Sequence, residues 1–120
     1  MAATRVLVVD PHPIQAASLS ASLDEASNFT TQACTSYLDV PDCLESFHPE
    51  IIVINVYQGL TDDALHACRE IAALPGEHVI VLIAPRSVVT GELFSLDALE
   101  AGADGVLISE ELDLAKLRKA

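Results

Sequence analysis

Three polar side chains of this sequence could do chemistry, because Asp10, Asn55 and Ser109 each directly follow a short apolar run. A carboxylate such as Asp10 could help to hold a hard cation such as Mg²⁺, which prefers oxygen ligands. The neutral amide of Asn55 is a far poorer nucleophile than a carboxylate. A site built from these residue types is better suited to binding than to covalent chemistry.

Five short apolar runs recur along the chain, each bounded by turn or helix-capping residues: 6–9, 29–34, 51–54, 79–83 and 105–108. The first, third and fourth are continuous and rich in β-branched residues, which is typical of strands covered on both faces of a parallel sheet.

Helical patterns lie between these runs. Apolar residues spaced by three and four form one face in each of three segments: Ala16, Leu19, Leu23 and Ala26; Leu65, Cys68 and Ile71 or Ala72; and Leu93, Leu96 and Leu99. Pro13 suits a first helical turn, and Gly102 suits a helix C-terminus. The alternation predicts an α/β fold, a doubly wound five-stranded parallel sheet flanked by five helices. We expect residues 1–120 to form one domain.

Composition restricts the function. The formal net charge of −12 argues against direct binding of nucleic acid, which needs a surface of Lys and Arg. No apolar run approaches the ~20 residues of a membrane helix, and no export signal opens the chain. Cys34, Cys43 and Cys68 have no metal-binding spacing and are expected to be reduced. We therefore expect a cytoplasmic protein without a cofactor.

Four stretches of this sequence together resemble the receiver domain of two-component response regulators. They are VLVVDPHP at 6–13, PEIIVIN at 49–55, HVIVLIA at 78–84 and ALEAGADGVL at 98–107. The resemblance implies a flavodoxin-like strand order of 2-1-3-4-5. The DPHP opening is similar to receivers that carry a C-terminal helix-turn-helix domain, which would make this chain the N-terminal part of a longer transcription regulator.

The resemblance also implies a phosphorylation site from which the reactive groups are missing. Receivers hold Mg²⁺ with two acids after the first strand, and by position these are Asp10 and Pro11. Their phosphoryl acceptor is an aspartate after the third strand, and here it is Asn55. Receivers have three further switch positions: a Ser or Thr after the fourth strand, an aromatic residue in the fifth strand that moves with that hydroxyl, and a Lys after the fifth strand. Here these positions are Ile83, Val106 and Ser109.

Alternatives remain open for these positions. Asp10 is either a solvated strand-end residue that accepts backbone N–H bonds or a vestigial metal ligand. Asn55 either satisfies loop hydrogen bonds or mimics one switch state. We expect Ile83 and Val106 to pack together and hold one arrangement. His12, His48 and His78 lie at element edges and are interpreted as solvated.

The segment 85–97 is longer than in most receivers by about four residues, or about one helical turn. The extra length lies within 85–91, where it predicts a rebuilt loop or a longer fourth helix. Receivers contact partners through the fourth helix, fifth strand and fifth helix, which correspond here to 88–99, 105–108 and 110–119.

The leading hypothesis is a pseudo-receiver that is not an enzyme. It would act by phosphorylation-independent dimerisation or partner binding. The alternatives are a small-ligand sensor that uses the vacated pocket at Asp10, Asn55 and Ser109, and a residual phosphoryl-accepting switch.

Overall fold

A five-stranded parallel sheet forms the centre of the computed structural model, which describes residues 4–26, 29–74, 76, 78–90 and 93–111. The strands are β1 (Thr4–Val9), β2 (Phe29–Cys34), β3 (Ile51–Asn55), β4 (Val79–Ala84) and β5 (Gly105–Ile108). The helices are α1 (Pro13–Ala26), α2 (Val40–Phe47), α3 (Thr61–Ala73), α4 (Arg86–Val89) and α5 (Phe94–Glu100), with short 3₁₀ turns at Tyr37–Asp39 and Ser109–Glu111.

The sheet has the order β2-β1-β3-β4-β5, and every pair of neighbouring strands is parallel. All five predicted strands are confirmed, as are the fold class and the order. The central strands are buried because helices cover both of their faces, which explains their continuous apolar sequence.

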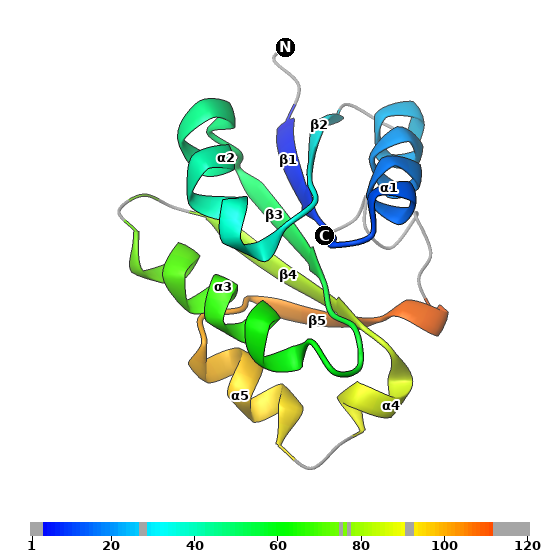
Figure 1. Cartoon of the computed structure of the whole chain (residues 1–120), viewed down its shortest axis with the longest axis vertical. Coiled ribbons are helices and arrows are strands. Elements are labelled where there is room, and N and C mark those ends of the chain that lie inside the picture. The colour runs from blue at the N-terminus through cyan, green and yellow to red at the C-terminus, as the bar shows by residue number, and fades with distance from the viewer. Residues whose placement is uncertain (1–3, 27–28, 75, 77, 91–92, 112–120) are drawn as a thin grey trace.

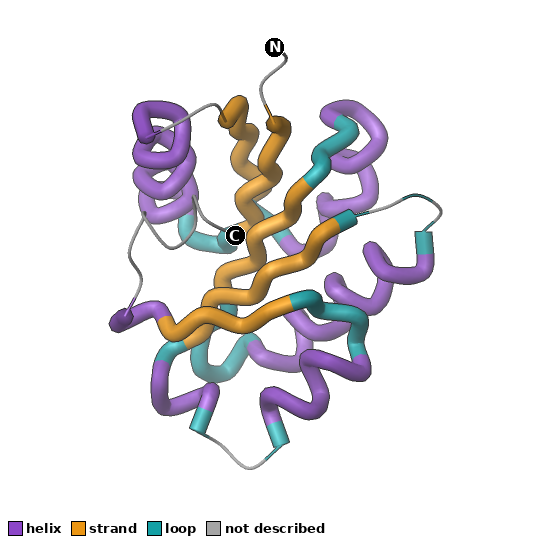
Figure 2. Tube along the Cα trace, turned by 180° about the vertical axis from the view of Figure 1, so that it is seen from behind, coloured by secondary structure: helices purple, strands orange, loops and turns teal. Residues whose placement is uncertain are grey.

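Two apolar clusters lie on opposite faces of the sheet. The larger cluster packs the sheet against α2, α3 and α5, and it includes Leu44, Ile71 and Ala98. The smaller cluster packs Leu23 of α1 against β1, β3 and β4. Figure 1 shows α2, α3 and α5 in a row along one side of the sheet and α1 on the other, and Figure 2 shows the same layers from behind.

Helices α1 and α3 bury the faces that their sequences predict. In α1, Ala16 and Leu23 are buried and Leu19 is partly buried, whereas the side chain of Ala26 lies outside the described residues. In α3, Leu65, Cys68 and Ile71 are buried, but Ala72 is exposed. Asp62 and Asp63 occupy the first turn of α3, where negative charge complements the helix dipole.

Helix α5 departs from the expectation for its leucines. Read as an amphipathic stripe, Leu93, Leu96 and Leu99 should face the core, but they are 63%, 53% and 69% exposed. The helix instead buries Phe94 and Ala98. The physical reason is that α5 has two apolar faces. The face with Phe94 and the small Ala98 joins the larger cluster, because a small side chain allows the helix to approach the sheet closely.

The end of α5 agrees with the prediction for Gly102. This residue has φ = 102°, and its N–H donates to the Leu99 carbonyl oxygen at 3.1 Å. The N–H of Ala103 donates to the Ala98 carbonyl oxygen at 3.0 Å, which completes a Schellman-type end. A side chain at position 102 would also collide with Ala72, whose Cβ would lie 2.5 Å from an added Cβ.

The extra length after β4 forms a separate short helix, α4, in place of a single longer fourth helix. The expected helix over 110–119 falls mostly outside the described residues. No helix in the described ranges is long and apolar enough to span a membrane.

Candidate functional site

The candidate site lies at the carboxyl ends of β1 and β3, which are neighbours in the sheet. The register pairs Val9 with Ile54, so that Asp10 and Asn55 emerge side by side. The backbone N–H of Asp10 continues the ladder to β2 by donating to the Cys34 carbonyl oxygen at 2.9 Å. Ligands of open α/β sheets bind at this edge, so the sequence places its polar residues where a site is expected.

Asp10 is a buried carboxylate that the protein itself saturates with hydrogen bonds. Its side chain is fully buried, so the interpretation of Asp10 as a solvated residue is wrong. Oδ2 accepts a bond from Asn55 Nδ2 at 2.6 Å, and Oδ1 accepts one from the backbone N–H of His12 at 2.8 Å. The predicted backbone bond is confirmed, but side-chain donors replace water because the loop after β3 folds over Asp10.

Tyr57 closes the site, and it was not singled out from the sequence. Its hydroxyl lies 2.9 Å from Oδ1 and 2.8 Å from Oδ2 of Asp10, and the Gln15 side chain approaches the same hydroxyl. The ring of His12 packs edge-on against the Tyr57 ring, with 4.3 Å between centroids. A hydroxylated aromatic residue only two positions after the end of β3 is the signal that could have identified it.

A second tyrosine holds the other side of Asn55. The Tyr37 hydroxyl donates to the Asn55 carbonyl oxygen at 2.6 Å. Burial raises the pKa of Tyr37, and the negative charges of Asp10 and Asp63 raise it further. Burial also raises the pKa of Tyr57, and its hydrogen bond to Asp10 adds to the rise. Both phenols therefore stay protonated at neutral pH and act as donors.

The Mg²⁺ site that receivers imply does not fit these residues. Of the three positions where receivers carry acids, only Asp10 is a carboxylate here, because Pro11 and Asn55 stand at the other two. Mg²⁺ would also have to displace the Tyr57 hydroxyl or the Asn55 amide from the oxygens of Asp10. Within the described ranges, no group of three His, Cys, Asp or Glu side chains could hold a metal ion.

Ser109 stands at the end of β5, where receivers place a lysine. Its hydroxyl donates to Glu110 Oε1 at 3.2 Å. The same oxygen accepts the backbone N–H of Arg86 at 2.8 Å, and this bond is the main reason why the pKa of Glu110 is lowered. Glu110 thus caps α4 from outside the helix, and Ser109 is part of that link.

Ile83 and Val106 do not pack together as predicted. Ile83 belongs to the smaller cluster, on the α1 side of the sheet, whereas Val106 packs against the larger cluster on the opposite side. The register explains the difference, because it pairs Ile83 with Leu107 and Val106 with Leu82. Neighbouring residues of a strand point to opposite faces, so a shift of one residue separates the two side chains.

The histidine interpretations hold for His12 and His48, which are exposed, but not for His78. The Nδ1 atom of His78 is buried and has no hydrogen-bond partner among the described residues. His48 ends α2 with φ = 52°, and its carbonyl oxygen accepts a bond from Arg5 Nε at 2.8 Å.

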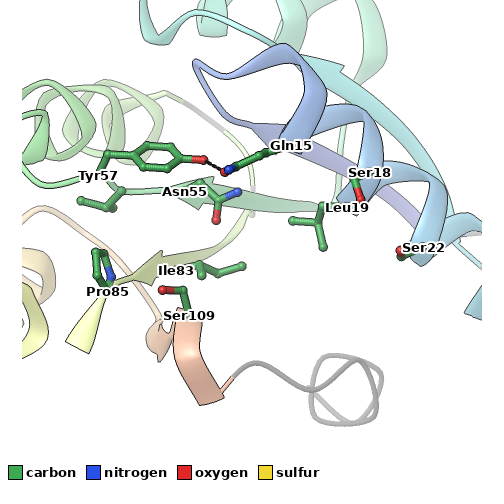
Figure 3. A pocket seen from close by; sticks show the side chains of 10 residues that line it. Gln15, Ser18, Leu19, Ser22, Asn55, Tyr57, Ile83, Pro85 and Ser109 are labelled. Atoms are coloured by element: carbon green, nitrogen blue, oxygen red, sulfur yellow. Dashed lines mark hydrogen bonds between the residues drawn. The ribbon is translucent and has the colours of Figure 1, made fainter. Parts of the chain in front are cut away.

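A hollow of about 400 Å³ opens beside Asn55, between α1 and the ends of β3, β4 and β5. Figure 3 shows Asn55, Ile83 and Ser109 around it, opposite side chains of α1. Its lining residues are Gln15, Ser18, Leu19, Ser22, Asn55, Val56, Tyr57, Ile83, Pro85 and Ser109. None of them carries a charge, so this lining offers no cation to a phosphoryl group.

Solved structures place this arrangement in a known fold. The response regulator domain of Thermotoga maritima CheB superposes with a TM-score of 0.77 at 18% identity, over 98% of this chain and 96% of that one. A LuxR family DNA-binding response regulator from Silicibacter pomeroyi gives a TM-score of 0.72 at 26% identity, over 98% and 87% of the two chains. The chain has the receiver-domain fold.

The same receiver-like fold occurs in a putative pilus assembly protein from Burkholderia thailandensis, at 22% identity and a TM-score of 0.71, over 96% of each chain. No family model and no curated protein matches the sequence. The likeness to the LuxR family response regulator, at 26% identity, supports a role in signal transduction.

Proposed function

We propose that this receiver-like domain is a pseudo-receiver, a signalling module that contacts its partner without being phosphorylated and catalyses no reaction. The observation that carries the proposal is the 2.6 Å bond from the Asn55 amide to the Asp10 carboxylate. In this arrangement the acceptor position donates a hydrogen bond to the acid that would otherwise hold the cation. The two groups satisfy each other and leave no anionic pair for a metal and a phosphoryl group.

The free energy of the hydrogen bonds to Asp10 also supports the proposal. A hydrogen bond to a charged group contributes roughly 1.5–3 kcal/mol. Asp10 accepts such bonds from His12, Asn55 and Tyr57, and a metal ion would have to displace at least one of the last two. A neutral amide is also a poor nucleophile, so Asn55 gives phosphoryl transfer neither an attacking group nor a charge.

The proposed output is a protein contact through the predicted surface of 88–99, which includes most of α5, together with β5 and the segment 110–119, either with a partner or with a second copy. The similarity to the LuxR family regulator of Silicibacter pomeroyi supports transcription as the process controlled, through a DNA-binding domain attached to this one. The net charge of −12 supports leaving DNA contact to that other domain.

The test of this proposal is incubation with acetyl phosphate and Mg²⁺, followed by intact mass measurement. An ordinary receiver domain with its aspartate serves as the positive control. We expect no mass gain here, because the acceptor carboxylate is missing. A phosphoryl group mapped to Asp10 or to the loop after β3 would support the residual-switch alternative and overturn the proposal.

A second candidate, a sensor of a small uncharged molecule, is favoured by one observation. The hollow of about 400 Å³ beside Asn55 carries the hydroxyls of Ser18, Ser22 and Ser109 and no charged side chain. Pockets of this size bind small ligands. A thermal-shift screen of uncharged metabolites distinguishes the two functions, because a bound ligand raises the melting temperature. A hit whose effect is lost in Ser18→Leu would favour the sensor.

A further inference from the structure

Helix α5 carries three large apolar side chains on its outer side. Leu93, at the N-cap, and Leu96 and Leu99 are each more than half exposed. Their spacing of three places each next to the following one on the helix surface. Exposed leucines are common singly, as Leu38 shows, but a row of three on one short element forms an apolar patch of the kind found at contact sites.

A hollow of about 300 Å³ begins where this row ends, at the meeting point of α3, α4 and α5. It is lined by Thr61, Asp62, Leu65, Ser87, Val88, Leu93, Phe94 and Asp97. Figure 1 shows the three helix ends converging on the side of the sheet away from α1. The floor is apolar, from Leu65, Val88 and Phe94, so the hollow suits one apolar side chain of an incoming chain.

The rim of this hollow is acidic. Asp62 stands in the first turn of α3 and Asp97 in the first turn of α5, with Glu100 one turn further along. Neither Asp62 nor Asp97 forms an ion pair with any residue in the described part of the chain. Arg86 is the one basic residue within α4 and α5, and it has interactions of its own.

The acidic rim distinguishes between two possible binding partners, a second copy of this chain and a basic segment of another protein. A two-fold contact between copies would place the same patch on both sides. Asp62 and Asp97 would then face the same acids of a domain whose net charge is also −12, which is repulsive. A chain with basic residues beside apolar ones would instead complement both the rim and the leucine row.

We propose that the surface formed by Leu93, Leu96, Leu99 and the hollow between Asp62 and Asp97 binds a basic amphipathic segment of a partner protein. An apolar side chain of that segment fills the hollow, and its Lys or Arg side chains meet the two aspartates. This inference rests on the proposed function as a protein-contact module and names the chemistry of the partner.

The test uses three synthetic peptides of equal length, measured by fluorescence anisotropy against the full chain. The first is a helical leucine–lysine peptide with its leucines on one face. The second keeps the leucine pattern but carries glutamate in place of lysine, and the third is a scrambled version of the first. We expect the first peptide to bind, to weaken as salt is added, and to bind better than the other two.

The matched variants locate the site. Asp62→Asn with Asp97→Asn should weaken binding of the first peptide by about threefold to tenfold, as expected for two exposed charge pairs. The control is Asp42→Asn with Glu45→Gln, which removes two exposed charges from α2, including one in its first turn. This control should leave the affinity within a factor of two, roughly the ±0.5 kcal/mol expected of a remote surface change.

Several results would overturn the inference. They are absence of binding by the first peptide, equal binding of the scrambled or glutamate peptide, an equal effect of the α2 control, and self-association that Leu96→Glu abolishes. Repeating the titration after treatment with acetyl phosphate keeps the two proposals apart. A changed affinity there contradicts phosphorylation independence, whereas loss of charge discrimination contradicts only the partner chemistry.

Discussion

Asn55 Nδ2 donates a hydrogen bond to Asp10 Oδ2 across 2.6 Å, and this bond joins the ends of β1 and β3. Both residues lie where a receiver concentrates negative charge, but here one of them is a donor. The pair therefore acts as a structural contact between the carboxyl ends of the two strands. Its behaviour under substitution follows from that role.

Asn55→Asp should destabilise the domain and leave it unphosphorylated. The new carboxylate would face Asp10 at hydrogen-bond distance, so the two could not both ionise without cost. The folded-state pKa of one of them would rise above the unfolded value of about 3.9. The loss of stability should be small below that pH and grow as pH rises, reaching roughly 1–3 kcal/mol at neutral pH. Urea unfolding at several pH values measures it.

The control for this substitution is Asn55→Ala, which removes the bond to Asp10 without adding a charge. Its destabilisation should depend less on pH than that of Asn55→Asp. A variant Asn55→Asp that is as stable as the original and accepts a phosphoryl group would show that the carboxylate pair was not the obstacle.

Tyr57→Phe should lower the free energy of unfolding by roughly 1.5–3 kcal/mol, because it removes a hydrogen bond to a charged group and keeps the ring against His12. The pKa of Tyr57 is raised in the folded state, chiefly by burial. Its contribution is therefore complete below the unfolded pKa of about 10 and is lost as pH rises toward the folded value. Unfolding measured between neutral and alkaline pH should show a smaller alkaline loss in the variant. An unchanged stability at pH 7 would contradict the role assigned to the hydroxyl.

Mg²⁺ at millimolar concentration should leave the melting temperature unchanged. A ligand stabilises only in proportion to the logarithm of its saturation, and both oxygens of Asp10 already accept bonds from the protein. Differential scanning calorimetry with and without Mg²⁺ tests this. A saturable upward shift that disappears in Asp10→Asn would mean that the carboxylate does hold the ion.

Leu96→Glu should weaken binding of the leucine–lysine peptide and leave the fold intact. Leu96 is 53% exposed, so its replacement should change stability by no more than about 0.5 kcal/mol. The matched control is Ile14→Glu, an 85% exposed position on α1, across the sheet from α5. Anisotropy titration measures the peptide affinity of both variants, and thermal melting measures their stability. An equal loss of affinity in the two variants would argue against the α5 surface.

Gly102→Ala should cost roughly 1–3 kcal/mol in the free energy of unfolding, since the residue has φ = 102° and the added Cβ would lie 2.5 Å from the Cβ of Ala72. Gly59→Ala is the matched comparison, because Gly59 has φ = 89° with nothing within 4 Å of the added Cβ. The difference between the two variants in urea unfolding reports the collision with Ala72. Equal losses would mean that α3 moves away at no cost.

Much of the fold could be predicted because its signals are local. The bounds predicted for the strands 29–34 and 105–108 agree with those observed, because turn or helix-capping residue types lie on either side of each segment. The meeting of Asp10 and Asn55 could also be predicted, because neighbouring parallel strands end at the same edge. The absence of the acceptor carboxylate could be predicted as well, because it follows from the residue type at position 55 alone.

Only the tertiary structure decided three further features. Helix α5 has two apolar faces, and the contact with the sheet selected Phe94 and Ala98 over the leucine row. The exact register of β4 against β5 placed Ile83 and Val106 on opposite faces. The loop after β3 carried Tyr57 onto Asp10. Each outcome depends on which distant surface a side chain meets, and spacing along one segment contains no information about the shape of another.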